Sequence, residues 1–331
     1  MRDKIAGALY GMALGDAMGM PAELWGRKRV KAFFGRIEGF LDGPAENDVA
    51  FNYKKGQFTD DTGQALVLLD SIESTDYEPD TRDIALRMLA WAEKENAFEN
   101  NILGPTSKVA LANFRDNIQD SRITDKALSN GSAMRIAPIG CLFRPEQKED
   151  IARYVYLVSR ATHTSDVTIA GAAMIAEAVS SAIVKDDFEK VMEDVFGIEE
   201  IGYGMGCETF SPKLGERLKI GLDIAKAHRG DDEGFIRRLY DVVGAGVGII
   251  ESVPAALSVA YFAQDPNRSC LLCANMAGDT DTIGAMATAV CGAFTGMGRK
   301  KPEYIRNLRQ QNDADFDHSI RIMEKGRERF A

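Results

Sequence analysis

The chain has 331 residues, of which 45% are hydrophobic and 27% are charged, and its net charge is −10. So acidic a chain is not expected to bind nucleic acid through a broad electrostatic surface, although a local pocket could still hold a phosphorylated ligand. Five cysteines are too few, and odd in number, for a secreted disulfide scaffold. Cys270 and Cys273 form a lone CxxC that is typical of an apolar helix face rather than of a zinc site.

The N-terminal segment lacks the cleavage-site pattern of a signal peptide. The longest uncharged run, residues 282–298, is short for a membrane span and is rich in Gly, Ala and Thr. We therefore expect a cytoplasmic protein without a membrane segment, and the oligomeric state is left open.

Hydrophobic periodicity and helix-start signals predict helix after helix, so the expected fold class is all-α. The predicted helices cover residues 3–18, 62–73, 80–95, 107–118, 148–161, 166–184, 187–195, 212–230, 232–243, 253–264, 267–276, 282–297, 302–310 and 314–329. A single short strand is predicted near residues 49–53. The segments 35–58 and 120–147 are long irregular connections, which in a compact domain are usually functional or disordered.

Glycines recur every four residues in the first predicted helix, at positions 7, 11, 15 and 19. This spacing puts them in a stripe along one face. Because each glycine weakens a helix by about 1 kcal/mol relative to alanine, we expect a compensating close approach of another helix or of a ligand.

Two acidic clusters stand at opposite ends of the chain, at residues 59–62 (TDDT) and 279–282 (DTDT). Each precedes a run of small and apolar residues. Taken alone, the first cluster is explained by a well-started helix, because aspartates in a first turn complement the helix dipole. The second, between Gly278 and Gly284, favours a metal site, since two aspartates in a turn can face one ion.

If the fold brings both clusters together, four carboxylates repel one another unless divalent cations neutralise them. All-oxygen ligands suit hard metals such as Mg²⁺, Ca²⁺ or Mn²⁺. A shared site also requires the two ends of the chain to pack together. We therefore expect one domain over residues 1–331, although the length alone suggests about two.

Three further polar elements are candidates for ligand contacts. The turn at residues 129–135 (SNGSAMR) can present backbone N–H groups to a phosphate or a sugar hydroxyl, or can simply be a turn. His163 lies in a polar junction between two predicted helices, where a structural role is the alternative. Glu23 follows Pro21 in a predicted loop, so it is either a general-base candidate or an exposed loop residue.

These stretches together resemble the ADP-ribosylglycohydrolase family, of the dinitrogenase-reductase-activating and ADP-ribosyl-acceptor hydrolase type. The matching segments occur in family order over residues 6 to about 296: GALYGMALGDAMGMPAE, FTDDTGQAL, NGSAMRIAPIG, SRATHTSD, ESVPAAL and GDTDTIGAMA. The combination of TDDT and GDTDTIG is the most specific part. The resemblance implies a compact all-α bundle around a dinuclear Mg²⁺ or Mn²⁺ site.

The resemblance also implies roles for individual residues. The metal ligands would be Thr59, Asp60, Asp61, Asp279, Asp281 and Thr282. The substrate's phosphates and ribose would be held by Asn130, Gly131, Ser132, Met134 and His163. Glu23 would lie in the loop covering the metals, Asp16 would support the ligands, and Asp61 or Glu23 would act as base. The implied reaction is metal-assisted hydrolysis of a ribosyl C1 bond in a small-molecule or ADP-ribosylated substrate.

The chain departs from the family pattern in one place. Members that cleave ADP-ribosyl-arginine usually carry an acidic residue before a Gly-Asn-Thr step, whereas this chain has Asn101 at the matching position and Glu99 two residues earlier. Trp25 and the pair at residues 33–34 are also expected to give the mouth of the site a different shape. Two alternatives to an ADP-ribosyl hydrolase therefore stay open. One is a nucleosidase with the same metals, and the other is a catalytically silent binding protein, against which the retention of all six candidate ligands counts.

Overall fold

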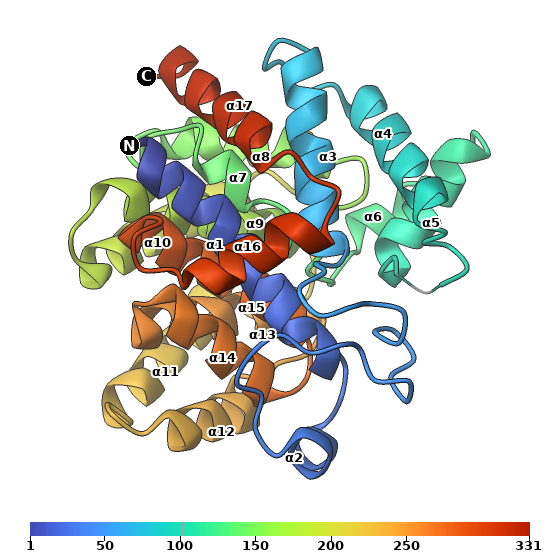
Figure 1. Ribbon diagram of the computed structural model, residues 1–331. Coiled ribbons are helices and arrows are strands. Elements are labelled where there is room, and N and C mark those ends of the chain that lie inside the picture. The colour runs from blue at the N-terminus through green and yellow to red at the C-terminus, as the bar shows by residue number, and fades with distance from the viewer. Residues whose placement is uncertain (101) are drawn as a thin grey trace.

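The computed structural model describes residues 1–100 and 102–331, and within them the fold is all-α, as predicted (Figure 1). These ranges contain no strand and only three isolated bridges. The helices in chain order are α1 (Arg2–Gly19), the 3₁₀ helix η1 (Met20–Ala22), α2 (Arg27–Phe34), α3 (Asp60–Ser74), α4 (Thr81–Lys94), α5 (Pro105–Arg115), α6 (Arg122–Asp125), α7 (Ala137–Gly140), α8 (Lys148–Ser159), α9 (Asp166–Val184), α10 (Phe188–Tyr203), α11 (Leu214–Ala227), α12 (Asp232–Val242), α13 (Ile249–Ala263), α14 (Pro266–Met276), α15 (Thr280–Thr295), α16 (Pro302–Gln311) and α17 (Phe316–Arg329).

Several boundaries differ from the predictions. Residues 49–53 form turns rather than a strand, because the side-chain oxygen of Asn47 accepts hydrogen bonds from the backbone N–H groups of Val49 and Ala50. Helix α13 begins at Ile249, four residues before the predicted start, and runs through Pro254. Helix α2 was not predicted, and the short helices α6 and α7 lie inside the connection 120–147.

The glycine stripe of α1 packs against α15, and the two helices run antiparallel through the centre of the molecule (Figure 1). A Cβ atom on Gly11 would lie 2.3 Å from the backbone oxygen of Thr288, and one on Gly15 would lie 1.9 Å from that of Gly284. At the end of the stripe, the Thr280 hydroxyl donates a hydrogen bond to the Gly19 carbonyl over 2.7 Å. The contact therefore places η1 beside the N-terminus of α15.

Helix α9 is the most apolar long helix of the described residues. By length and composition it could cross a membrane, but 94% of its 18-residue apolar window is buried inside the protein. It packs against α8, α10, α13 and α15, so the apolar residues are explained by core packing. One hydrophobic cluster includes side chains from α1 to α17. The single domain over residues 1–331 stays a prediction.

The packing predicts that Gly11→Ala destabilises the protein by about 1–3 kcal/mol, because the methyl group would collide with backbone that cannot rotate away. This outweighs the gain in helix propensity of about 1 kcal/mol. The matched control is Gly197→Ala in α10, whose Cβ would meet only the flexible Lys148 side chain. Urea unfolding of both variants checks the prediction. If Gly11→Ala were as stable as the unmodified protein, or more stable, the prediction would be wrong.

Candidate metal centre

The candidate metal centre lies where η1 and the N-termini of α3 and α15 meet. Thr59 precedes the first turn of α3 in an extended conformation, and Asp279 precedes α15. The turn before Asp279 requires positive φ angles, +78° at Ala277 and +82° at Gly278. A Cβ on Gly278 would lie 2.1 Å from the Ala245 backbone oxygen, so this position needs glycine for space as well as for φ.

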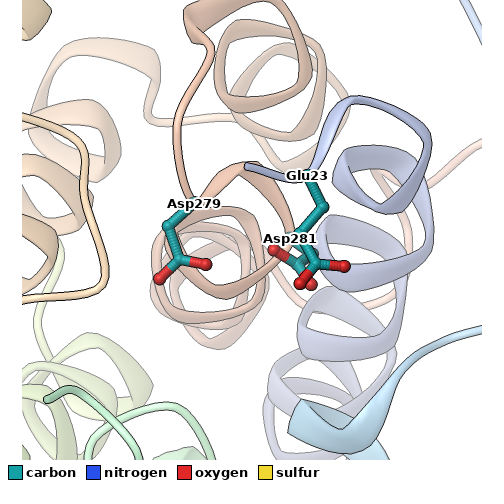
Figure 2. Close-up of side chains that lie close together, drawn as sticks. All are labelled: Glu23, Asp279 and Asp281. Atoms are coloured by element: carbon teal, nitrogen blue, oxygen red, sulfur yellow. The ribbon is translucent and has the colours of Figure 1, made fainter. Parts of the chain in front are cut away.

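The two acidic clusters meet in this centre, as the sequence predicted. Glu23, Asp279 and Asp281 each offer an oxygen, and these oxygens lie within 4.8 Å of one another (Figure 2). The Thr59 hydroxyl lies 3.1 Å from Asp61 Oδ2 and 3.5 Å from Asp281 Oδ2. Residues more than two hundred positions apart therefore share one polar site.

Asp16 of α1 fixes the start of α3. Its carboxylate accepts hydrogen bonds from the backbone N–H groups of Thr59 (2.8 Å) and Thr62 (3.0 Å), and from their hydroxyls over 2.9 and 2.6 Å. This buried carboxylate holds the Thr59–Thr62 turn in place. On the other side, Asn130 Nδ2 donates to Asp279 Oδ2 over 2.5 Å, and Thr282 also hydrogen-bonds to Asp279.

The centre is strongly anionic and poorly hydrated. Burial raises the pKa of Asp16 and of Asp279 to about 6, and burial with the charges of Asp16 and Asp279 raises the pKa of Asp60 to about 8. The pKa values of Asp61, Asp281 and Glu23 are also raised, by burial first and then by the neighbouring carboxylates. Without a cation, the folded protein therefore favours protonated carboxyl groups here.

Two buried carboxylate oxygens show whether the site suits a cation. Asp61 Oδ1 and Asp281 Oδ1 are buried, and neither has a hydrogen-bond partner in the described ranges. A buried carboxylate oxygen without a donor is costly, and a hard divalent cation is the ligand that suits it. The donor set consists of carboxylate and hydroxyl oxygens only, which fits Mg²⁺ or Mn²⁺ rather than zinc.

The 129–135 turn lies next to the carboxylates, but its side chains differ in accessibility. The backbone N–H groups of Ala133 and Met134 donate to the Asn130 carbonyl, so they close the turn. Ser132 is fully buried, and its hydroxyl donates to the Thr168 carbonyl. Gly131 packs on His163, since a Cβ there would lie 2.7 Å from the His163 ring.

His163 is fully buried beneath this turn. One ring nitrogen lies 3.0 Å from the Ser129 hydroxyl and the other 2.8 Å from the Thr162 hydroxyl. Burial and the nearby Arg135 keep its pKa well below the usual value, so the ring is neutral. His163 therefore faces hydroxyl groups and supports the turn through Ser129.

Arg135 is a buried cation that the sequence did not connect to the acidic cluster. Its guanidinium donates to Gln64 Oε1 over 2.7 Å and to the Thr162 hydroxyl over 2.6 Å. Burial lowers its pKa to about 10, which leaves it charged at neutral pH, and its charge opposes the rise in the pKa of Asp60. The pattern of the 129–135 turn signalled a polar role for Arg135 but not its partners.

An open cleft of about 640 Å³ begins at Thr59 and Gly63. Its aromatic wall is formed by Tyr53, Phe58 and Trp91. The sequence had placed Trp91 on an apolar helix face, which gave no signal of a cleft. Trp25, expected at the mouth, is instead buried against Phe33, with ring centroids 5.2 Å apart.

The expected departure near the cleft is only partly described. Glu99 is exposed at the end of the turn that follows α4. Asn101, which occupies the position of the missing acidic residue, lies outside the described residues.

Comparison with known proteins now decides the family. The ADP-ribosylglycohydrolase family model matches residues 1–328. The chain belongs to the ADP-ribosylglycohydrolase family. It is 44% identical to the protein YegU of Escherichia coli K12 over 98% of both chains, and 25% identical to mouse ADP-ribosylhydrolase ARH3 over 96% of this chain and 89% of ARH3. A solved structure titled "ADP-ribosylglycohydrolase-related protein complex" shares the fold with a TM-score of 0.71 at 21% identity, over 99% of this chain and 98% of that chain.

Members of this family are hydrolases, so the prediction of an enzyme of this type is confirmed. Membership of the family also supports hydrolysis of ADP-ribose conjugates as the general type of reaction. The individual site residues, the leaving group and the identity and number of the metal ions stay predictions.

The raised pKa values predict how the metal-free protein responds to pH. Because the folded state binds more protons than the unfolded state between about pH 4 and pH 8, stability should fall as the pH rises through this window. Mg²⁺ should therefore raise the melting temperature more at pH 8 than at pH 5. Calorimetry with EDTA or with Mg²⁺ measures this, and Asp61→Asn should weaken the pH dependence. A metal-free protein that becomes more stable from pH 5 to pH 8 would contradict the electrostatic account.

Proposed function

We propose that this protein hydrolyses the ribosyl C1 glycosidic bond of an ADP-ribosyl conjugate with two Mg²⁺ or Mn²⁺ ions. One observation carries the proposal: a chain of this hydrolase family brings its two acidic clusters together around buried carboxylate oxygens that have no hydrogen-bond partner among residues 1–100 and 102–331. The residues proposed to hold the ions are Thr59, Asp60, Asp61, Asp279, Asp281 and Thr282. When bound, such ions supply Lewis-acid stabilisation to oxygens of the substrate and lower the pKa of water.

Side chains of the protein would orient the proposed ligands and accept a proton. Asp16 and Asn130 orient Thr59 and Asp279, so these oxygens need not reorganise when the substrate binds. Glu23, at the end of η1, keeps part of its side chain exposed and shares the 4.8 Å cluster with Asp279 and Asp281. We assign to Glu23 the removal of a proton from the attacking water, with Asp61 as the other candidate base.

Binding of the rest of the substrate would use the turn and the cleft. We assign contacts with ribose and phosphate to the turn residues Asn130, Gly131 and Met134, with Ser132 and His163 supporting the turn from below. The aromatic wall of the cleft suits stacking of a nucleobase.

A nucleosidase remains the second candidate, and one observation favours it. Of the cleft's lining residues, Lys94 is the only cation, and it pairs with Asp313 over 3.7 Å, while Asp70 and Glu95 add negative charge. Such a lining suits a neutral ligand better than a diphosphate. We also expect, as the sequence suggested, a cytoplasmic enzyme that acts on a small-molecule or ADP-ribosylated substrate and requires neither nucleic acid nor a membrane.

The substrate class is tested with a panel: ADP-ribosyl-arginine, ADP-ribosyl-serine and O-acetyl-ADP-ribose against free nucleosides, each with Mg²⁺ and with EDTA. We expect Mg²⁺-dependent cleavage of at least one ADP-ribosyl conjugate. Cleavage of nucleosides alone would replace the first proposal by the second. Absence of any turnover by Mg²⁺-loaded protein would instead favour a silent binding protein.

Asp60→Ala and Asp279→Ala should each weaken Mg²⁺ binding and abolish turnover, because each removes a proposed ligand. Calorimetric titration with Mg²⁺ and the panel assay measure the two effects separately. The control is Asp223→Ala on the exposed face of α11, which removes the same charge far from the centre. Full activity in both centre variants would refute the ligand assignment.

Glu23→Gln tests the proposed base. The variant should lower kcat by about 10²–10⁴-fold, the usual contribution of a general base, while Mg²⁺ still binds. Loss of Mg²⁺ binding in this variant would show that Glu23 is a ligand instead. The pH dependence of kcat gives an independent readout, since the acidic limb, over which a general base loses its proton, should change only when the base is removed.

A further inference from the structure

We propose that a second site, between α2, α12 and α14, binds a small phosphorylated ligand. A pocket of about 400 Å³ lies there, within the size range of small-molecule sites of about 300–1,000 Å³. None of the residues assigned to the metal centre lines it, and Figure 1 shows α2 and α12 at one end of the molecule. Four cationic side chains line the pocket: Arg27, Lys28, Lys31 and Arg36.

The cations gather because of the helix period. Positions 27, 28 and 31 of α2 lie on one face, and Arg36 follows directly after Gly35, whose φ of +64° ends the helix. This concentration of positive charge stands out in a chain whose net charge is −10. A local positive field in an acidic protein indicates an anionic ligand rather than a general solubility role.

The acidic residues of the pocket do not cancel this charge. Asp232 accepts hydrogen bonds from Arg268, over 2.5 and 3.2 Å, so its charge is already paired. Glu233 pairs with Arg27 over 3.3 Å. Lys28, Lys31 and Arg36, by contrast, form no ion pair with any residue of the described ranges.

Arg27 supplies an observation that points to a ligand. Its Nη1 is buried and has no hydrogen-bond partner in the part of the chain that the structure describes. Glu233 binds only the other terminal nitrogen, and the guanidinium carbon lies 5.7 Å from the Tyr240 ring centroid. A buried N–H of a charged group without an acceptor is costly. Because Nη1 is covered by protein, the Arg27 side chain must move before it can donate to a phosphate oxygen, whereas the exposed Lys28, Lys31 and Arg36 can do so directly.

The rest of the lining is apolar and defines the other part of the ligand. Val30, Ile236 and Leu272 are almost fully buried beneath the cations, and Leu271 is half-buried at the wall. The Asn275 side chain is already engaged with both backbone groups of Ile37. Cations beside a buried apolar floor suit a small molecule with a phosphate and a flat or apolar group, such as a nucleoside monophosphate. A concave pocket of this size does not suit a nucleic-acid duplex.

Binding of AMP, inorganic phosphate, adenosine and a short DNA duplex to the full-length protein, measured by calorimetric titration, tests the site. We expect AMP to bind more tightly than phosphate, any binding of adenosine to be unaffected by the pocket variants described next, and AMP affinity to fall as NaCl rises. The charge-reversal variant Lys28→Glu/Lys31→Glu should weaken AMP binding by at least about tenfold. Leu271→Trp should also weaken it, by filling the pocket without changing its charge.

The matched control is Arg321→Glu/Lys325→Glu on the exposed face of α17, which changes the charge equally elsewhere. It should leave AMP binding unchanged, and all variants should keep Mg²⁺ binding and catalysis. If AMP bound at the acidic centre instead, both pocket variants would bind it as tightly as the unmodified protein. Unchanged AMP affinity in these two variants would therefore overturn the proposal. Failure of AMP and phosphate to bind at all, or binding of duplex DNA in their place, would overturn it as well.

Discussion

The backbone contact between α1 and α15 is the constraint on which the rest of the structure depends. Two helices approach this closely only if side chains are absent along the seam, and Gly7, Gly11 and Gly15 remove them on one side. The register of the contact is then fixed by the hydrogen bond from Thr280 to the Gly19 carbonyl. As a result, α1 and the following η1 bring Glu23 to the N-terminus of α15, where Asp281 lies in the first turn.

The acidic centre shows how a fold can hold mutually repelling groups in place. Asp16 accepts four hydrogen bonds from the Thr59–Thr62 turn, and Asn130 donates to Asp279, so several oxygens are oriented by neutral partners. Asp61 and Asp281 each keep one buried oxygen that the described residues leave without a donor. The scaffold thus holds one oxygen of these carboxylates by hydrogen bonds and leaves another open, which suits a cation site.

The sequence predicted the helices well where apolar residues recur with the helix period, as in α4 and α17. It failed at α2, because the segment from Arg27 to Phe34 is dominated by cations and its only buried side chain is Val30. It also placed the start of α13 at residue 253, four residues late, although the helix runs through Pro254. The clusters at residues 59–62 and 279–282 were found from local composition. Their proximity depends on the packing of the glycine stripe of α1 against α15, and the sequence alone does not identify α15 as the partner helix.

Side-chain partners explain why the ligand-binding part of the site was harder to predict than the acidic part. Carboxylates at a helix start can be recognised in the sequence from their residue type and spacing. For His163, the family resemblance implied a substrate contact, whereas its polar junction left a structural role open, and both its ring nitrogens face hydroxyl groups of Ser129 and Thr162. Arg135 binds Gln64 and the same Thr162 hydroxyl, so a buried cation and its neutral acceptors link the acidic helix α3 to the turn whose Asn130 holds Asp279. A network of this kind fixes the position of the acidic helix and of the 129–135 turn, and its members are recognisable only once the fold has brought them together.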